Sequence, residues 1–446
     1  MISVSGVRGI VGDDLTPDLV GRYAAAFGTL AREQGNPTVV LARDTRTSGP
    51  MFAAAVQAGL QSVGCRVVEL GVVPTPTAQL AVEHHHAGGG IVITASHNPI
   101  EWNALKFVGP DGVFLDAATG ARLRQMAEEG VPCLGWEGIG AVDRDAGAVD
   151  RHVELVLDLP QIDVDAIRRR GFNVALDCVR GAGGVIMPRL LETLGCEVAA
   201  IGLETDGQFP RSPEPVPANL GELCDLVRRV GADVGFAVDP DVDRLALVDE
   251  HGRAIGEDYT LAFGVEAVLR HDTGPVVVNL STSLVVDDAA REFGVAIGRA
   301  PVGEANVARA MREAGAVVGG EGNGGVMLPA LHLGRDAPLA AALALQLLAD
   351  EAESVGDRVA RRPAYTIVKA KAPRRGDLEP LYEMLGRTFS DAVADRQDGL
   401  RLAWPDRWLH VRPSGTEPIV RLIAEAPSAE AAERLVAAAR GILESA

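Results

Sequence analysis

Residues 234–248 decide the fold, and they read Val234-Gly-Phe-Ala-Val238, Asp239-Pro-Asp241-Val-Asp243-Arg244 and Leu245-Ala-Leu-Val248. The two flanking runs are short and apolar, as is typical of buried strands. Three carboxylates and one arginine fill the connection between them. Because the acidic segment follows a buried strand directly, a metal site is favoured over a solvated acidic loop.

The three aspartates of this connection are candidate metal ligands. In an extended segment, residues i, i+2 and i+4 point to one side, so Asp239, Asp241 and Asp243 would converge. A hard divalent cation would relieve their mutual repulsion, and oxygen-only ligands favour magnesium or calcium over zinc. An EF-hand is disfavoured, because its sixth loop position requires glycine and here holds Arg244.

Strand-like and helical segments alternate on both sides of this stretch. The alternation begins with a strand over 37–42 and restarts near residues 171 and 258, which gives three structural repeats recognised by pattern and not by residue identity. Such alternation predicts α/β units with mixed or largely parallel sheets. The C-terminal part instead combines short strands with helices expected over 378–394 and 429–443, as in a smaller α+β domain.

The length of 446 residues allows three or four domains at roughly 100–200 residues each. Plausible boundaries lie near residues 145–149 and 361–363. The predicted domains are three α/β domains and a C-terminal α+β domain, at 1–150, 151–252, 253–360 and 361–446.

Composition limits the partners and the compartment. A net charge of −19 repels nucleic acid and anionic membranes. The five cysteines are scattered with no CxxC pair, which favours a reducing compartment. We find no signal peptide and no apolar run of about 18 residues or more, so a cytoplasmic location is expected.

A candidate nucleophile lies in Thr94-Ala-Ser96-His97-Asn98-Pro99, which follows the apolar strand 90–94. Ligands bind at the carboxyl ends of strands in open α/β sheets, so this place suits a reactive serine. No G-x-S-x-G elbow surrounds Ser96, which favours phosphoryl transfer over acyl transfer. The alternative is an ordinary serine turn or helix cap.

Two further loops carry groups suited to ligands. Residues 319–325 are rich in glycine, which permits close backbone approach, and Glu321 and Asn323 could bind hydroxyl groups. The loop 412–418 and the following Arg421 could form a phosphate nest of arginines, hydroxyls and backbone amides. The alternatives are a flexible surface turn for the first loop and a type II turn between strands for the second.

Lysine is rare in this chain, which holds only Lys106, Lys369 and Lys371. Lys106 lies ten residues after Ser96, and a lysine can shift its pKa and donate a proton whereas an arginine effectively cannot. Lys106 is therefore a candidate acid/base residue, with a chance surface lysine as the alternative.

Taken together and in order, the motifs resemble the α-D-phosphohexomutase superfamily, which includes phosphoglucomutase, phosphomannomutase and phosphoglucosamine mutase. The resemblance runs the whole length of the chain. It is carried by Ser5–Gly9, Arg43–Gly49, Gly71–Thr77, Thr94–Pro99, Asp239–Arg244, Gly320–Gly325 and Arg412–Pro418.

The resemblance implies four domains around a central cleft, with Ser96 as a phosphoserine and one Mg²⁺ held by its phosphate and the three aspartates. A hexose 1,6-bisphosphate would be the intermediate and activator. Arg8 and Lys106 would line the cleft, and Arg244 would sit near the phosphoserine. Glu321 would meet sugar hydroxyls, with Asn323 beside it. The distal phosphate would be bound by Arg412, Ser414, Gly415, Thr416 and Arg421.

The sequence departs from the family pattern most at Gly325, where many members carry histidine. The family histidine at this position is a second acid/base, and no residue of the loop corresponds to it here. His97 and His332 are the two histidines considered in its place, and no motif supports either of them. Asn323 also stands where serine is usual, Ala104 replaces a usual glycine, and Pro240 replaces glycine in the metal loop.

The resemblance predicts an intramolecular phosphotransferase acting on a small sugar phosphate, as a monomer or homodimer. Glucosamine phosphate is the expected substrate, and mannose or glucose phosphate is the alternative. A metal-dependent sugar phosphatase using Ser96 and a non-catalytic sugar-phosphate sensor are the rival functions.

Overall fold

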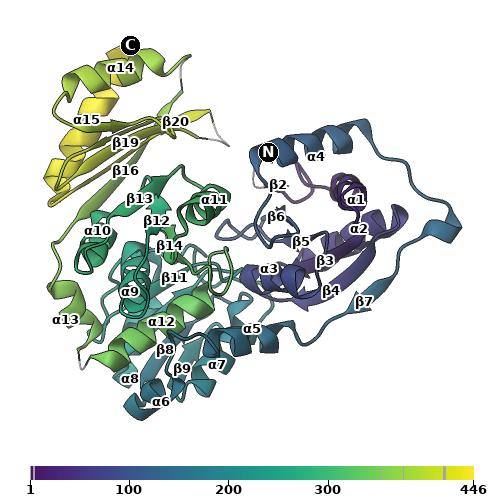
Figure 1. The fold of residues 1–446 in the computed structure, drawn as a ribbon, viewed down its shortest axis with the longest axis horizontal. Helices are drawn as coiled ribbons and strands as arrows, with labels where there is room; N and C mark the ends of the chain where they lie inside the picture. The colour runs from purple at the N-terminus through teal and green to yellow at the C-terminus, as the bar shows by residue number, and fades with distance from the viewer. Residues whose placement is uncertain (1, 4–5, 352, 375, 415–417, 446) are drawn as a thin grey trace.

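A computed structural model describes residues 2–3, 6–351, 353–374, 376–414 and 418–445, and it contains four β-sheets (Figure 1). We call each sheet, with the helices that pack on it, a unit. The predicted class is confirmed: three units are α/β with mixed sheets, and the fourth is α+β with an antiparallel sheet. No helix in the described part of the chain combines the length and the apolar character needed to cross a bilayer.

The first unit has a seven-stranded sheet in the order β1-β2-β6-β5-β3-β4-β7. Its strands are Ile2–Ser3, Gly6–Ile10, Thr38–Arg43, Arg66–Val72, Gly89–Ile93, Trp102–Val108 and Val142–Arg144 for β1 to β7. Its helices are Pro17–Glu33, Gly49–Ser62, Thr75–His84 and Ala117–Glu129 for α1 to α4.

The second and third units each have a four-stranded sheet, in the orders β11-β10-β8-β9 and β13-β12-β14-β15. Strands β8 to β11 are Asn173–Asp177, Glu197–Ile201, Val234–Val238 and Leu245–Val248, and β12 to β15 are Val276–Asn279, Ile297–Ala300, Val318–Glu321 and Gly325–Met327. Helices α5 to α8 are Ala148–Leu157, Val164–Arg170, Gly183–Thr193 and Gly221–Val230. Helices α9 to α13 are Glu257–Leu269, Leu284–Arg291, Glu304–Ala314, Ala337–Asp350 and Val355–Ala360.

The three α/β units share one topology, which explains the repeated pattern in the sequence. The shared part is β3 to β6 in the first unit, β8 to β11 in the second and β12 to β15 in the third. In each set the first strand lies between the second and the third, these three are parallel, and an antiparallel fourth strand borders the third. The connection from the third strand to the fourth is therefore equivalent in all three units: it joins β5 to β6, β10 to β11 and β14 to β15.

The fourth unit is an antiparallel sheet in the order β16-β20-β19-β18-β17. Its strands β16 to β20 are Thr366–Pro373, Val393–Asp395, Leu400–Ala403, Trp408–Pro413 and Ile419–Ala426, and its helices α14 and α15 are Glu379–Thr388 and Ala429–Ser445. The helix predicted over 378–394 is too long, since α14 ends at Thr388 and residues 393–395 pair with β18. Pairing at the sheet edge here overrides the helical pattern, and the β-branched Val393 favours a strand.

The second and third units share one apolar core, whereas the first and fourth units have cores of their own. A single cluster of buried side chains runs from Val153 to Val355 and includes both faces of α9 and α12. Separate clusters fill the first unit and the fourth. The loops of the second and third units are thus held on one packed block; in Figure 1 the fourth unit lies above the third unit and the first unit lies to its right.

Candidate active site

The candidate residues gather on the three equivalent connections. Ser96 lies between β5 and β6, the three aspartates lie between β10 and β11, and Glu321 ends β14 just before β15. Each connection starts at the carboxyl end of a parallel strand, where side chains can converge on a ligand. The three connections meet near the middle of the view in Figure 1, where the first three units adjoin.

The Ser96 loop is held by a buried arginine that donates to four of its carbonyl groups. Arg46 Nη1 and Nη2 lie 2.6 Å from the carbonyl oxygens of Ser96, Asn98 and Pro99, and 3.0 Å from that of Trp102. Ser96 itself has φ of +50°, a left-handed conformation that is uncommon for a residue other than glycine. The loop is thus fixed in a strained shape, as active-site loops often are.

The backbone before Ser96 is fixed by a second set of contacts. Thr94 Oγ1 accepts from the Ser96 amide at 2.9 Å and donates to Asp44 Oδ2 at 2.7 Å. Asp44 also pairs with Arg46 Nε at 3.1 Å, and both side chains are fully buried. Arg46 and Asp44 therefore connect the loop to the core of the first unit.

The Ser96 hydroxyl points at the aspartate cluster. Ser96 Oγ donates to Asp239 Oδ2 at 2.8 Å, although the two residues come from different units. His97 Nδ1 lies 3.3 Å from the same hydroxyl. The charge of Arg244, burial and the charge of Arg8 lower the pKa of His97 to about 2, so its ring is neutral.

The three aspartates converge, but by a turn and not by the extended segment expected from the sequence. The Val242 amide donates to the Asp239 carbonyl at 3.1 Å, and Val242 has φ of +63°. Asp239 Oδ1 accepts from the amides of Asp243 and Arg244 at 3.2 and 3.3 Å. The left-handed residue and the side-chain cap bend the chain so that all three carboxylates face inward.

Three backbone amides from three units hold this turn. The carbonyl of Pro240 accepts from Ala182 N of the second unit, and that of Val242 accepts from Ala337 N of the third. The carbonyl of Asp241 accepts from Thr75 N of the first unit. Tertiary contacts therefore supply the hydrogen bonds that an extended strand would have made with a neighbour.

The buried carboxylates carry unequal pKa values. Burial, together with the charges of Asp243 and Asp241, raises the pKa of Asp239 well above its usual range. Burial alone would also raise the pKa of Asp241, but the ammonium of Lys106 and hydrogen bonds from Lys106 and Thr75 hold it well below its usual range. Lys106 Nζ lies 2.6 Å from Asp241 Oδ2 and 3.3 Å from Asp243 Oδ2.

Lys106 is therefore no chance surface lysine. Only 7% of its side chain is exposed, and burial alone would lower its pKa, but Asp241 and Asp243 raise it above the ordinary value. The side chain extends from β6, directly beside the Ser96 connection. Lys106 thus brings a positive charge to the carboxylate cluster from the first unit.

The aspartate cluster fits a divalent cation. One oxygen from each of the three carboxylates lies within 4.8 Å of the others. Asp241 Oδ1 and Asp243 Oδ1 are buried, and neither has a hydrogen-bond partner among the residues that the structure describes. Such unsatisfied, all-oxygen groups are the ligands that magnesium or calcium would take.

Two arginines flank the Ser96 loop. Arg8, on β2, donates to Asn98 Oδ1 at 2.7 Å, and burial lowers its pKa although it remains a cation. Arg244 Nε lies 3.6 Å from Asp243 Oδ1, and its Nη1 lies 3.8 Å from Glu214 Oε1. The structure thus brings Arg8, His97, Lys106 and Arg244 to the Ser96 and aspartate loops.

The glycine-rich loop packs directly on the aspartate turn. The Leu245 amide donates to the Gly324 carbonyl at 3.0 Å, and a Cβ on Gly324 would lie only 2.3 Å from the Leu245 oxygen. Glu321 Oε1 accepts from Asn279 Nδ2 and the Gly303 amide, each at 2.9 Å. Asn323 Oδ1 is buried without a hydrogen-bond partner in the described part of the chain.

The candidate phosphate loop lies at the end of β19 and the start of β20. Arg412 and Arg421 are opposite each other on the two strands, and Arg412 Nε lies 2.7 Å from Asp398 Oδ2. The Ser414 amide donates to the Ile419 carbonyl at 2.9 Å. Gly415 and Thr416 lie outside the described residues.

Sequence reasoning missed three basic residues of these loops. Lys371 lies opposite Arg421 on β16, so Lys371, Arg421 and Arg412 form a row of cations across three strands. The rarity of lysine was the available signal for it. Arg46 and the buried Arg335 have most of their partners far away in sequence, so no local pattern shows what they contact.

His332, considered as a replacement acid/base, belongs to a buried network. Its Nε2 lies 2.9 Å from Asp336 Oδ2, which also lies 2.7 Å from His152 Nε2. His152 Nδ1 lies 2.8 Å from Thr77 Oγ1 on α3. The network joins the first three units through side chains that are all buried.

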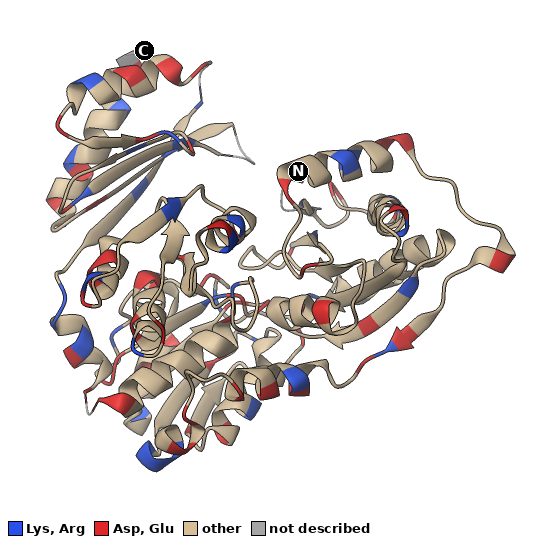
Figure 2. Ribbon diagram, in the orientation of Figure 1, with Lys and Arg blue, Asp and Glu red and all other residues tan. Residues whose placement is uncertain are grey.

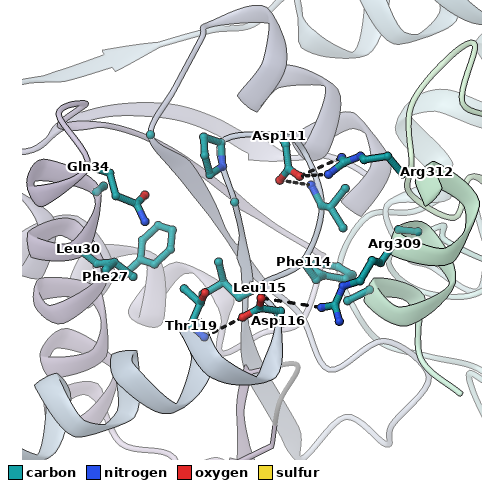
Figure 3. A pocket seen from close by; sticks show the side chains of 17 residues that line it. Phe27, Leu30, Gln34, Asp111, Phe114, Leu115, Asp116, Thr119, Arg309 and Arg312 are labelled. Atoms are coloured by element: carbon teal, nitrogen blue, oxygen red, sulfur yellow. Dashed lines mark hydrogen bonds and ion pairs between the residues drawn. The ribbon is translucent and has the colours of Figure 1, made fainter. Parts of the chain in front are cut away.

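A cavity of about 410 Å³ lies apart from these loops, between α1, the segment 109–116 and α11 (Figure 3). Of the candidate residues that the structure describes, none lines it. Two ion pairs cross from the first unit to α11: Asp111 with Arg312 at 2.9 Å and Asp116 with Arg309 at 3.8 Å.

These two ion pairs are expected to contribute little to stability. Both are about half exposed, and exposed pairs contribute roughly 0.2–1 kcal/mol each. We therefore expect the double change Arg309→Ala and Arg312→Ala to lower Tm by no more than about 4 °C in a thermal scan. A larger fall would show that the pairs act together with the rest of this interface.

Comparison with known proteins identifies one family along the chain. Four segments match phosphoglucomutase/phosphomannomutase alpha/beta/alpha domains I, II and III and the C-terminal domain, at residues 2–131, 150–252, 256–365 and 368–442. A Thermococcus kodakarensis protein named "Phosphoglucomutase/phosphomannomutase" is 38% identical, over 99% of this chain and 98% of its own. A Methanopyrus kandleri protein named "Probable phosphoglucosamine mutase" is 39% identical, over 97% and 95%.

The fold agrees with these matches. A crystal structure of a phosphoglucomutase/phosphomannomutase family protein from Burkholderia thailandensis superposes with a TM-score of 0.86 and 28% identity, over 100% of this chain and 97% of the other. The four matched segments follow the four units in order. The chain belongs to the phosphoglucomutase/phosphomannomutase family.

Proposed function

We propose that this protein is a phosphohexomutase, which interconverts a hexose 6-phosphate and the corresponding 1-phosphate through phosphorylated Ser96. The observation that carries the proposal is the hydrogen bond from Ser96 Oγ to Asp239 within a buried cluster of three carboxylates. A phosphoryl group on this oxygen would lie against a site fitted for a cation. Phosphoryl transfer depends mainly on positioning and charge neutralisation, which such a site provides.

The proposed reaction has two transfers. In the first, a sugar hydroxyl oxygen loses its proton and bonds to phosphorus, while the bond from phosphorus to Ser96 Oγ breaks and Ser96 Oγ takes up a proton, which gives a hexose 1,6-bisphosphate. The intermediate then turns end for end. In the second, Ser96 Oγ loses its proton and bonds to the other phosphorus, while the bond from that phosphorus to its sugar oxygen breaks and this oxygen takes up a proton. Mg²⁺, held by Asp239, Asp241, Asp243 and the Ser96 phosphate, would neutralise charge on the transferring group.

The surrounding residues have separate proposed roles. Lys106 and Arg244 place positive charge beside the aspartates, and Lys106 is the proposed acid/base residue. Arg8 and His97 orient and contact the Ser96 loop. Glu321 and Asn323 bind the sugar hydroxyls. The phosphate that is not transferred is bound by Arg412, Ser414, Gly415, Thr416 and Arg421, with Lys371 beside them.

We infer that glucosamine phosphate is the preferred substrate, because a carboxylate such as Glu321 can bind an amine as well as hydroxyls. Mannose and glucose phosphates remain the alternative, since relatives carry both kinds of name. We also propose the domain limits 1–150, 151–252, 253–360 and 361–446, a cytoplasmic location and a monomer or homodimer. The matched family segments support these limits to within about twenty residues.

A coupled assay tests the function. The protein is given Mg²⁺, a trace of hexose 1,6-bisphosphate and the 1- or 6-phosphates of glucosamine, mannose and glucose in turn. Dominant isomerisation of glucosamine phosphate is expected. Comparable turnover of mannose and glucose phosphates would assign dual specificity, release of free phosphate without isomer would assign a phosphatase, and no turnover would support a sensor.

The distal phosphate site gives a separate prediction. The combined change Arg412→Ala and Thr416→Ala should raise KM at least about tenfold, because charge-assisted contacts to phosphate contribute roughly 1.5–3 kcal/mol each. Steady-state kinetics would show the rise with a smaller change in kcat. A matched control is Arg407→Ala, because Arg407 is a partly exposed arginine of the same unit that pairs with Asp406. An unchanged KM in the double variant would remove the phosphate assignment.

A further inference from the structure

Arg335 is a buried arginine shared among three carboxylates of the candidate site. Its Nη2 lies 2.6 Å from Asp243 Oδ2, its Nη1 lies 2.9 Å from Glu321 Oε2, and its Nε lies 2.9 Å from Glu304 Oε2. Only 8% of the side chain is exposed. Nη1 and Nη2 therefore join the glycine-rich loop to the aspartate turn, and Nε ties both to Glu304 on α11.

The glycine-rich loop leaves room for this side chain at Gly325. A Cβ added to Gly325 would lie 2.3 Å from Arg335 Cδ and 2.8 Å from its Cγ, both far inside van der Waals contact. Gly325 does not have a positive φ, so space and not backbone conformation is the requirement there. Any larger residue at position 325 would displace Arg335 from its present place.

Arg335 also connects the site to the first unit. Its partner Glu304, at the start of α11, accepts from Gln79 Nε2 on α3 at 3.0 Å through its other oxygen. The remaining oxygen of Glu321 is held by Asn279 and the Gly303 amide. Both oxygens of Glu321 therefore have fixed partners, and Arg335 sets the direction of one of them.

A buried ion cluster of this kind is weak evidence for stability. Desolvation can cancel the attraction, and well-packed apolar side chains often stabilise as much. A guanidinium group holds carboxylates in a fixed geometry, which a lysine ammonium does not. The benefit of this cluster is therefore expected in the orientation of Asp243 and Glu321.

We propose that Arg335, seated in the space left by Gly325, is a positioning residue that fixes the sugar-binding carboxylate of Glu321 relative to the aspartate turn. The inference rests on the proposed function, because it takes Glu321 as the sugar contact. Arg335 occupies the space that a side chain at position 325 would need. It thereby couples the sugar site of the third unit to the second unit.

The test compares Arg335→Lys and Arg335→Met with Arg358→Lys and Arg358→Met. Arg358 is a fully buried arginine of the shared core that pairs with Glu266 and Glu351, away from the candidate loops. We expect kcat/KM to fall at least tenfold in Arg335→Lys and at least a hundredfold in Arg335→Met. Both Arg358 variants should lower Tm and leave kcat/KM within twofold of the wild type.

A double-mutant cycle identifies positioning as the cause. The combined change Arg335→Met and Glu321→Gln should cost little more in kcat/KM than the larger of the two single changes, since Arg335 acts through Glu321. In a Ser96→Ala background, which cannot turn over, calorimetry should show weaker binding of glucosamine 6-phosphate when the change Arg335→Met is added. Additive losses in the cycle, or unchanged binding, would overturn the proposal.

A second route avoids loss of the buried charge. Gly325→Ala should displace Arg335 and reduce kcat/KM at least fivefold, whereas Gly221→Ala, at a glycine with open space around it, should have no effect. If Arg335→Met does not fold, the two single variants Gly325→Ala and Arg335→Lys provide the test. Wild-type kinetics in both of them would overturn the inference. Absence of mutase activity in the wild type would instead refute the proposed function, while the calorimetric comparison would still test Arg335.

Discussion

Replacing Ser96 with alanine is expected to reduce kcat at least about a thousandfold, because the hydroxyl oxygen that carries the phosphoryl group is removed. The loop should keep its shape, since Arg46 binds its carbonyl groups and the amide of residue 96 still donates to Thr94. The left-handed conformation at position 96 strains serine and alanine alike. Tm should therefore change by only a few degrees.

The measurement combines the coupled mutase assay with intact-mass analysis and a thermal scan. Wild-type protein treated with hexose 1,6-bisphosphate should carry one phosphoryl group, and Ser96→Ala should carry none. Ser62→Ala is the matched control, because Ser62 Oγ only donates to the Gly59 carbonyl near the end of α2. Turnover of Ser96→Ala near the wild-type rate would refute the phosphoserine mechanism.

The parts of the fold that could be predicted are those that depend on residues close together in the sequence. The loop with Asp239, Asp241 and Asp243 can be recognised because it directly follows an apolar strand. The same order of strand, loop and strand recurs around Ser96 and Glu321. The repeated topology places these loops at equivalent positions. The sequence therefore indicates the right loops even where the expected backbone shape is wrong.

The backbone at Val242 shows why that shape could not be predicted. An extended acidic segment and a tight turn both bring alternate carboxylates together, and propensity alone disfavours φ of +63° for a β-branched residue. The turn is chosen by amides of Thr75, Ala182 and Ala337, which come from three units. Contacts so distant in sequence leave no local signal.

Two buried arginines of the site, Arg335 and Arg46, could not be predicted for the same reason. Arg335 is ninety-two residues from Asp243, and Arg46 is fifty residues from Ser96. Arg46 lies in the family motif Arg43–Gly49, but the local sequence of neither arginine shows which distant groups it contacts. The helix α12, which begins just after Arg335, is apolar on all faces, so its sequence does not show which face meets the aspartate turn.

The aspartate turn provides the second large expected effect. Asp241→Asn should reduce kcat at least about a thousandfold and should abolish the stabilisation of the protein by Mg²⁺. A ligand that binds only the folded state stabilises it by RT ln(1 + [L]/Kd), about 2.7 kcal/mol at a hundred times Kd. Asp241 keeps one buried oxygen without a hydrogen-bond partner among the described residues, as Asp243 does, and this oxygen is available to a cation.

Thermal scans in EDTA and in millimolar Mg²⁺ measure this effect without any substrate. The wild type should show a higher Tm with Mg²⁺, and Asp241→Asn should show the same Tm in both. Asp177→Asn is the matched control, because Asp177 is a buried aspartate at the end of β8 in the same sheet and pairs with Arg211 at 2.6 Å. That control should lose some stability through its broken ion pair yet keep the full Mg²⁺ shift. An undiminished shift in Asp241→Asn would place the cation elsewhere and would remove the aspartate turn from the proposed mechanism.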